Sequence, residues 1–185
     1  ERQRIAILGG GSWATAIAKI VLNNVDEINW YMRRQEQIDE FIRLSKNPSY
    51  LTGVKFNTDH IRFTSNINHV VATSDILIFA TPSPFLKDHL KKLNRKLNKK
   101  IIVSAIKGIV PNENLIITEF FEQFYQVPKE NIAVLAGPCH AEEVALERLS
   151  YLTLASASRD RAKMLSQFFA TSFVKTSVSE DVIGM

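Results

Sequence analysis

The sequence predicts an α/β fold in which helices cover both faces of a doubly wound, mainly parallel sheet. First, short apolar segments alternate with segments of helical periodicity along the whole chain. Second, the apolar segments are continuous, as in residues 76–80, which is typical of strands buried on both faces. Third, a glycine-rich turn at residues 9–11 separates the first predicted strand from the first predicted helix.

The predicted elements follow one another in a regular order. Strands are expected where apolar residues run without interruption, at residues 4–8, 28–32, 61–64, 76–80, 101–105, 132–136, 151–157 and 173–176. Helices are expected where apolar residues recur every three or four positions, at residues 13–22, 35–44, 84–97, 114–125 and 159–169. The aromatic side chains of the fourth helix, Phe120, Phe121, Phe124 and Tyr125, are interpreted as core.

Length and composition favour a single folded domain spanning residues 1–185. The chain has 185 residues, of which 45% are apolar, enough for a sizeable core. A net charge of +4 without a dense basic tract does not favour nucleic acid as a partner. No apolar run is long enough to span a membrane, and the single cysteine, Cys139, excludes an internal disulfide, so a cytoplasmic location is expected.

The glycine-rich turn has the pattern of a dinucleotide-binding fingerprint. Gly9 permits a sharp turn, Gly11 leaves room for a pyrophosphate against the backbone, and the small Ala14 lets the helix pack closely on the strand. The helix that follows would point free N–H groups at the phosphates. Because the pattern lies between a strand and a helix, it predicts a Rossmann-type domain that binds a nicotinamide dinucleotide, rather than a glycine-rich turn without a ligand.

The end of the second predicted strand bears on the choice of dinucleotide. An acidic residue there would bind the ribose 2′-hydroxyl of NAD, whereas this chain has Arg33 and Arg34. Guanidinium groups suit a 2′-phosphate, so the sequence favours NADP over NAD. The alternative interpretation is a solvated pair of surface charges.

Three other strand ends carry candidate functional residues. Residues 80–84 contain two prolines and form a rigid turn, and Lys107 follows the next strand as a cation beside the expected nicotinamide and substrate. Residues 136–142 end a further strand and open a helix that could hold an anion.

The adjacent Cys139 and His140 are not interpreted as a nucleophile and its base, and His89 is expected to be solvated. The histidines lack metal-ligand spacing, so no metal is expected.

Six motifs in order resemble bacterial NAD(P)-dependent glycerol-3-phosphate dehydrogenase. They are residues 9–16, 47–53, 82–83, 107–109, 136–143 and 179–184. The resemblance covers the whole chain and implies reversible hydride transfer between NAD or NADP and a small phosphorylated substrate. In this family the reaction reduces dihydroxyacetone phosphate to sn-glycerol 3-phosphate for phospholipid synthesis. A homodimer is a further expectation for the full-length protein.

The resemblance also implies roles for individual residues. The residues expected to bind the cofactor are Gly9, Gly11, Ser12, Trp13, Arg33, Arg34, Tyr50, Lys107 and Ala141. Lys107, Gly137 and Cys139 are expected to contact the substrate. Cys139 stands where the family commonly has serine, and a thiol is a weaker hydrogen-bonding group, which puts that contact in doubt.

The family's second, all-helical domain, with its proton-transferring lysine, is absent from this chain. The chain is therefore expected to be the cofactor-binding half of the enzyme and to be inactive alone. Two alternatives remain: a Rossmann-type regulatory module that binds a nucleotide without chemistry, and another reductase of the same extended class, such as a ketopantoate reductase or a sugar-nucleotide dehydrogenase.

Overall fold

A computed structural model describes residues 2–105, 109–110 and 115–182 of the chain. The main sheet contains β1 (Ile5–Leu8), β2 (Ile28–Tyr31), β3 (Ile61–Thr64), β4 (Ile76–Phe79), β5 (Ile101–Ser104), β8 (Ile132–Ala136), β9 (Ser150–Ser156) and β10 (Val174–Ser179). A separate two-stranded ribbon pairs β6 (Ile109–Val110) with β7 (Leu115–Ile116). The helices are α1 (Ser12–Leu22), α2 (Gln35–Leu44), α3 (Ile67–Ala72), α4 (Ser83–Leu90), α5 (Ile117–Tyr125), α6 (Ala141–Ala145) and α7 (Arg159–Ser166), with short 3-10 turns at Thr58–His60 and Lys129–Asn131.

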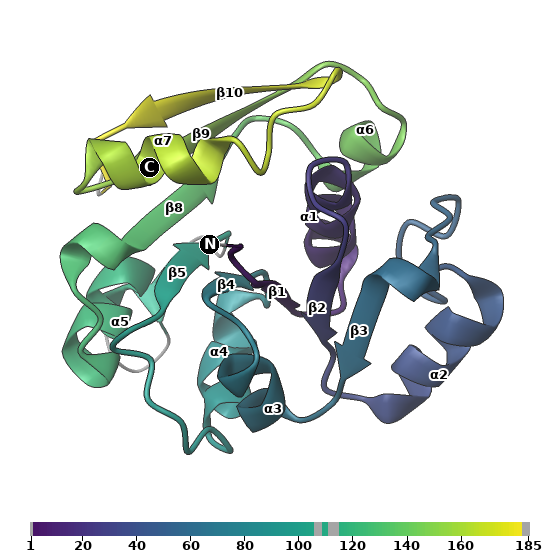
Figure 1. Cartoon of the computed structure of the whole chain (residues 1–185), viewed down its shortest axis with the longest axis horizontal. Helices are drawn as coiled ribbons and strands as arrows, with labels where there is room; N and C mark the ends of the chain where they lie inside the picture. The colour runs from purple at the N-terminus through teal and green to yellow at the C-terminus, as the bar shows by residue number, and fades with distance from the viewer. Residues whose placement is uncertain (1, 106–108, 111–114, 183–185) are drawn as a thin grey trace.

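The order of strands in the main sheet is β10-β9-β8-β5-β4-β1-β2-β3 (Figure 1). Strands β1 to β5 are parallel to one another and β8 is parallel to β5, whereas β9 is antiparallel to β8 and β10 is parallel to β9. The predicted doubly wound, mainly parallel sheet is thus confirmed. The chain builds outward from β1 in one direction and then from β4 in the other, so the order reverses between β1 and β4, where ligands bind in such sheets.

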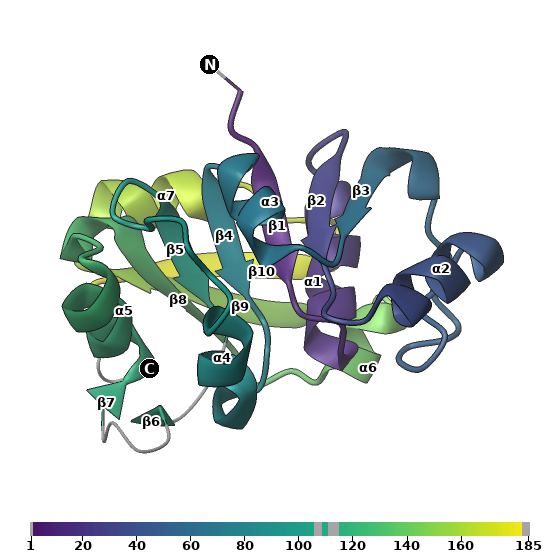
Figure 2. The same cartoon turned by 90° about the horizontal axis from the view of Figure 1, so that it is seen from below.

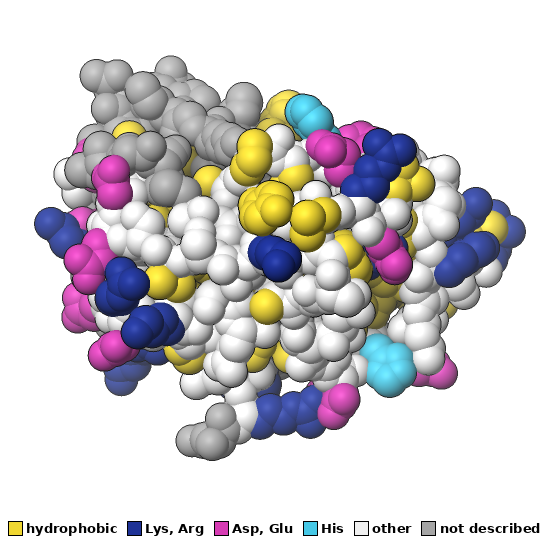
Figure 3. Space-filling model, turned by 90° about the horizontal axis from the view of Figure 1, so that it is seen from above, with side chains coloured by type: hydrophobic (Ala, Val, Ile, Leu, Met, Phe, Trp, Pro, Cys, Tyr) yellow, Lys and Arg dark blue, Asp and Glu magenta, His cyan; other side chains and the backbone are white. Residues whose placement is uncertain are grey.

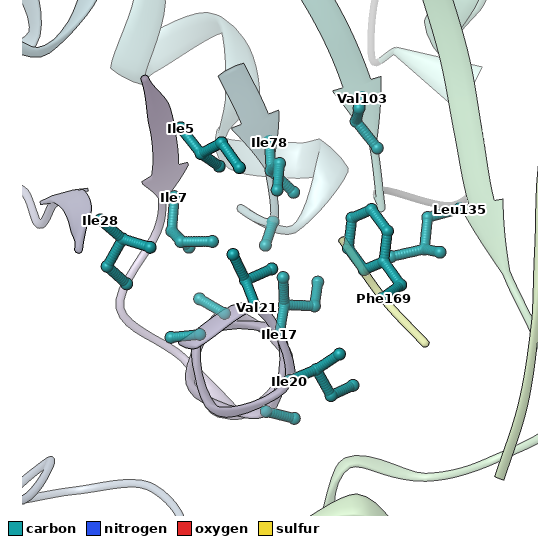
Figure 4. Close-up of a cluster of buried hydrophobic side chains, with 14 of the residues drawn as sticks. Ile5, Ile7, Ile17, Ile20, Val21, Ile28, Ile78, Val103, Leu135 and Phe169 are labelled. Atoms are coloured by element: carbon teal, nitrogen blue, oxygen red, sulfur yellow. The ribbon is translucent and has the colours of Figure 1, made fainter. Parts of the chain in front are cut away.

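Alternate side chains of each central strand enter two separate cores. In β1, Ile5 and Ile7 belong to one buried cluster, and Ala6 and Leu8 belong to the other. The first cluster lies under α1, α2, α6 and α7, and the second lies under α3, α4 and α5. Figure 4 shows side chains of α1 pointing toward the sheet in the first cluster. This period of two explains the uninterrupted apolar strands, because both faces are covered.

The fourth predicted helix is shorter than its sequence pattern indicates. The prediction was residues 84–97, whereas α4 ends at Leu90. Beyond it, the side chain of Asn68 in α3 donates a hydrogen bond to the carbonyl oxygen of Lys92 (3.0 Å) and accepts one from the backbone N–H of Asn94 (2.8 Å). These contacts occupy backbone groups that a continuing helix would use, so long-range pairing ends the helix.

The structure differs from the sequence prediction in two other elements. The sequence interpretation missed α3, whose cap is the side chain of Asn66, which accepts the N–H groups of Asn68 and His69. The last strand was predicted over residues 173–176 but extends to Ser179, because β10 pairs with β9 residue by residue from Val174 to Ser179.

The surface that carries β9 and β10 is mixed in character. Figure 3 shows basic and acidic side chains interspersed on it, with apolar side chains gathered near its centre. No helix in the described part of the chain combines the length and apolar character needed to cross a membrane.

The aromatic residues of α5 provide a direct test of the second core. Phe121 is fully buried, with its ring centroid 4.9 Å from that of Phe79 in β4, whereas Phe124 is 48% exposed. We expect Phe121→Ala to lower the free energy of unfolding by about 3–5 kcal/mol, because it removes apolar burial and leaves a cavity. The matched change Phe124→Ala should cost less than about 1 kcal/mol. Denaturant titration of both variants measures this, and equal losses would contradict the assigned burial.

Candidate functional site

The turn after β1 lies against the end of β4 at the point where the strand order reverses. Gly9 has a φ of +131°, a conformation that side chains disfavour. A Cβ atom at Gly9 would also lie 3.1 Å from the carbonyl carbon and oxygen of Ala80 and 3.2 Å from the nitrogen of Thr81. Glycine is therefore required here both by the backbone angle and by the close approach of the two strand ends.

Gly11 differs from Gly9 because the space beside it is empty. A Cβ atom at Gly11 would meet no atom of the described residues within 4 Å. Gly11 directly precedes α1, whose N-terminus has neither a side-chain cap nor an acidic residue in its first turn. An uncapped helix N-terminus next to open space can accept an anion, because its N–H groups and the helix dipole both favour negative charge.

A hollow of about 500 Å³ opens beside this turn. It is lined by segments that follow β1, β4, β5 and β8, together with one residue of β9. The lining residues are Gly11, Ser12, Trp13, Ala80, Thr81, Pro82, Ala105, Leu135, Ala136, Gly137, Pro138, Cys139, His140 and Leu152. α4 and α6 lie at this edge of the sheet, away from the N-terminus (Figure 2). The volume lies within the range of small-molecule and cofactor sites.

The structure brings together several of the predicted site residues. Gly11, Ser12 and Trp13 line the hollow together with Gly137 and Cys139. The last two are held by β9: a Cβ atom at Gly137 would collide with the carbonyl oxygen of Tyr151, and the Cys139 sulfur lies 3.9 Å from the same oxygen.

The remaining predicted residues lie beside the hollow or outside the described residues. Ala141 begins α6 and is buried, with Glu142 and Glu143 in the first turn of that helix. Tyr50 is exposed in the loop after α2. Lys107, the predicted catalytic residue, lies outside the described residues. His140 also lines the hollow, and its backbone N–H donates to Oε1 of Glu143 in the first turn of α6 at 2.9 Å.

Arg33 and Arg34 follow β2 at the same edge of the sheet and are exposed. Within the described residues, neither forms an ion pair with a carboxylate. Other arginines do so, as Arg4 does with Asp75 at 3.2 Å. The two guanidinium groups thus place positive charge at the strand end without internal neutralisation, which suits an anionic ligand.

His89 is a correction to the sequence interpretation, which placed it in solvent. It is half-buried against Tyr31, with ring centroids 6.1 Å apart, and its Nδ1 lies 3.5 Å from the hydroxyl oxygen of Thr81. Burial lowers the pKa of His89, and the charge of Arg33 lowers it further. Burial raises the pKa of Tyr31, whereas the charge of Arg33 lowers it. His89 therefore favours its neutral form, and Arg33 supplies the positive charge at this position.

Sequence interpretation also missed the side chains that fix the glycine turn. The indole N–H of Trp30, fully buried in β2, donates to the carbonyl oxygen of Gly9 at 2.7 Å. The hydroxyl of Thr15 donates to the carbonyl oxygen of Gly11 at 2.7 Å. Gln37 and Asn47 bind the carbonyl oxygen between them, that of Gly10. Of these four side chains, only that of Thr15 could have been found from the sequence, because it is a polar residue at a position expected to lie in the core.

Known proteins match the chain in both sequence and structure. Residues 4–162 match the family model of the NAD-dependent glycerol-3-phosphate dehydrogenase N-terminus. Glycerol-3-phosphate dehydrogenase [NAD(P)+] of Bacillus pumilus is 32% identical over 99% of this chain and 53% of its own length. The chain spans about half the length of the curated relatives that it matches.

Solved structures agree with this assignment. A Plasmodium falciparum glycerol-3-phosphate dehydrogenase superposes with a TM-score of 0.87 at 26% identity, over 98% of this chain and 53% of that one. The Coxiella burnetii glycerol-3-phosphate dehydrogenase gives a TM-score of 0.85 at 24% identity, over 99% of this chain and 55% of that one, which supports the fold. The chain belongs to the family of NAD-dependent glycerol-3-phosphate dehydrogenase N-terminal domains.

Proposed function

We propose that this chain binds NADPH or NADH across the carboxyl edge of its sheet, as the cofactor-binding half of a glycerol-3-phosphate dehydrogenase. The observation that carries the proposal is the open space at Gly11, beside an uncapped helix N-terminus and a hollow of about 500 Å³. A pyrophosphate fits there because backbone N–H groups can reach it without a side chain intervening. Ser12, Trp13, Tyr50 and Ala141 are proposed as further cofactor contacts.

The proposed reaction is the reversible reduction of dihydroxyacetone phosphate to sn-glycerol 3-phosphate. The bound nicotinamide supplies the hydride, and the chain binds and orients both partners. Gly137 and Cys139 are proposed to border the substrate, since they line the same hollow as Gly11. Lys107 is proposed to contact substrate and cofactor, and the proton for the developing alkoxide is assigned to a lysine of the family's second domain.

We further propose that Arg33 and Arg34 favour NADP(H) over NAD(H). Both lack a carboxylate partner within the described residues, and Arg33 acts electrostatically on Tyr31 and His89 at the same strand end. A 2′-phosphate would meet positive charge there, whereas a 2′-hydroxyl would gain little from it. A cytoplasmic location, a role in phospholipid synthesis and a homodimer of the full-length protein complete the proposal.

The phosphate site is tested by Gly11→Val. We expect this variant to fold normally, because a Cβ atom there meets no atom of the described residues within 4 Å, and to lose measurable binding of NADPH and NADH, because the side chain would fill the pyrophosphate's position. Fluorescence titration measures binding, and circular dichroism checks the fold. Gly53→Val is the matched control, since a Cβ there also meets nothing within 4 Å. A folded Gly11→Val variant with normal affinity would place the phosphate elsewhere.

The cofactor preference is tested by Arg33→Asp. We expect NADPH binding to weaken by about 1.5–3 kcal/mol through loss of a charge-assisted phosphate contact, and NADH binding to change little. Calorimetric titration at fixed ionic strength measures both ligands. Arg2→Asp makes the same charge change at an exposed site on the opposite edge of the sheet. A wild-type chain that binds NADH as tightly as NADPH would defeat the proposed preference.

The division of catalytic roles is tested by turnover. We expect the 185-residue chain to bind NADPH but to reduce no dihydroxyacetone phosphate, because the proposed general acid lies in the family's second domain. In a protein containing both domains, Lys107→Ala should lower kcat/KM at least ~100-fold, whereas the exposed Lys99→Ala should not. Oxidation of NADPH followed by absorbance measures this. Robust turnover by the 185-residue chain would refute these roles.

A further inference from the structure

Asn47 is a fully buried amide that lies between the two loops of the proposed cofactor site. Its Nδ2 donates to the carbonyl oxygen of Gly10 at 3.0 Å and to the hydroxyl of Thr15 at 3.0 Å. Its Oδ1 accepts the backbone N–H groups of Ser49 at 3.0 Å and Tyr50 at 3.2 Å. Because a carbonyl only accepts and an N–H only donates, these partners fix which end of the amide points each way.

The nitrogen end of Asn47 determines where the glycine turn points its donors. The carbonyl oxygen of Gly10 is held by Asn47 and, at 2.8 Å, by Gln37 of α2. No described peptide bond is cis, and in a trans peptide the C=O and the following N–H point in opposite directions. Holding the Gly10 carbonyl toward α2 therefore turns the N–H of Gly11 away from α2, as a phosphate-binding donor requires.

The oxygen end of Asn47 determines the start of the loop that carries Tyr50. Accepting the N–H groups two and three residues ahead closes a turn in which an Asn side chain replaces a backbone carbonyl. Tyr50 is 45% exposed, so little packing fixes its position, and this turn supplies the constraint. One side chain thus ties the position of Tyr50 to the orientation of the glycine turn.

We propose that Asn47 is a positioning residue that makes the glycine turn and the Tyr50 loop bind the dinucleotide as one unit. The inference rests on the proposed cofactor binding. It assigns different tasks to the two ends of one amide: the NH₂ group orients the pyrophosphate donors, and the oxygen orients Tyr50. Gln37 supports the first task directly, since its Nε2 donates to the Gly10 carbonyl at 2.8 Å, and the same Nε2 also donates to the Asn47 oxygen at 3.3 Å.

A double-mutant cycle tests the coupling between the two loops. Tyr50→Ala alone should weaken NADPH binding about 5-fold, and Asn47→Leu alone at least about 10-fold. In the double variant, Tyr50→Ala should add less than about 2-fold, because Tyr50 is no longer held in place. Fully additive effects would overturn the proposal. Asn29→Leu removes an amide with two hydrogen bonds at 2.9 and 3.2 Å near the opposite edge, and should leave affinity unchanged.

Asn47→Asp tests the role of the NH₂ group separately from that of the oxygen. It also provides a second test in case the Asn47→Leu variant does not fold. The new carboxyl keeps an acceptor for Ser49 and Tyr50, but when ionised it has no donor for the Gly10 carbonyl. When protonated, its O–H can donate to that carbonyl. We therefore expect the ratio of variant to wild-type Kd for ADP-ribose to fall about 5-fold or more between pH 8 and pH 5, with both proteins folded by circular dichroism.

The outcomes distinguish this inference from the proposed function. If the wild-type chain binds neither NADPH nor ADP-ribose, the proposed function fails, and the inference fails with it. If the wild-type chain binds both, a pH-independent ratio for Asn47→Asp overturns the inference alone. An unchanged affinity in Gln37→Met and Asn47→Asp together would also overturn it, because both remove donors from the Gly10 carbonyl.

Discussion

The close approach of the Gly9 turn to the end of β4 is the constraint on which the rest of the site depends. At 3.1 Å, the position that a Cβ would take already touches the Ala80 carbonyl, so the two central strands can end side by side only with glycine there. This contact brings the N-terminus of α1 to the point where the strand order reverses. The segments after β4, β5 and β8 then surround one hollow, although they are far apart in the sequence.

The glycine turn is held in place by hydrogen bonds to its carbonyl groups. Trp30, Gln37 with Asn47, and Thr15 bind the carbonyl oxygens of three successive glycines. Because each trans peptide points its N–H opposite to its carbonyl, bonds made on the protein side leave donors on the other side. The fold thus turns backbone N–H groups of the glycine turn toward the side on which the pyrophosphate is proposed to bind, away from the side chains that hold the carbonyl groups.

The sequence predicted the parts of the fold that depend on local patterns. Apolar runs located the central strands, and the glycine spacing located the turn, because both reflect burial and backbone angles of neighbouring residues. It did not predict the end of α4, since Asn68 stops that helix from a distant position in the chain. The antiparallel direction of β9 was equally invisible, because a buried strand has the same composition in either direction.

The candidate site likewise has parts that the sequence predicts and parts that it does not. Gly11, Ser12 and Trp13 follow from one motif, whereas the meeting of Gly137 and Cys139 with them depends on how distant strands align. Asn47 lies in a segment with the composition of a loop, and only its hydrogen bonds to five residues reveal a buried link. His89 misled the sequence interpretation because its neighbours on α4 are polar, while its ring packs against Tyr31 from another strand.

Charge is distributed unevenly along the carboxyl edge of the sheet, and this follows from burial. Arg33 is exposed beside a half-buried His89, whose pKa burial and the charge of Arg33 both lower. Around the glycine turn the described lining is largely uncharged, so the field there comes from the helix N-terminus and the backbone N–H groups. The proposed dinucleotide would therefore meet two sources of positive charge along one edge: the fixed dipoles at the N-terminus of α1, and the exposed guanidinium groups after β2. Substitutions at the dipole end should therefore affect every dinucleotide, and substitutions at the guanidinium end should distinguish between them.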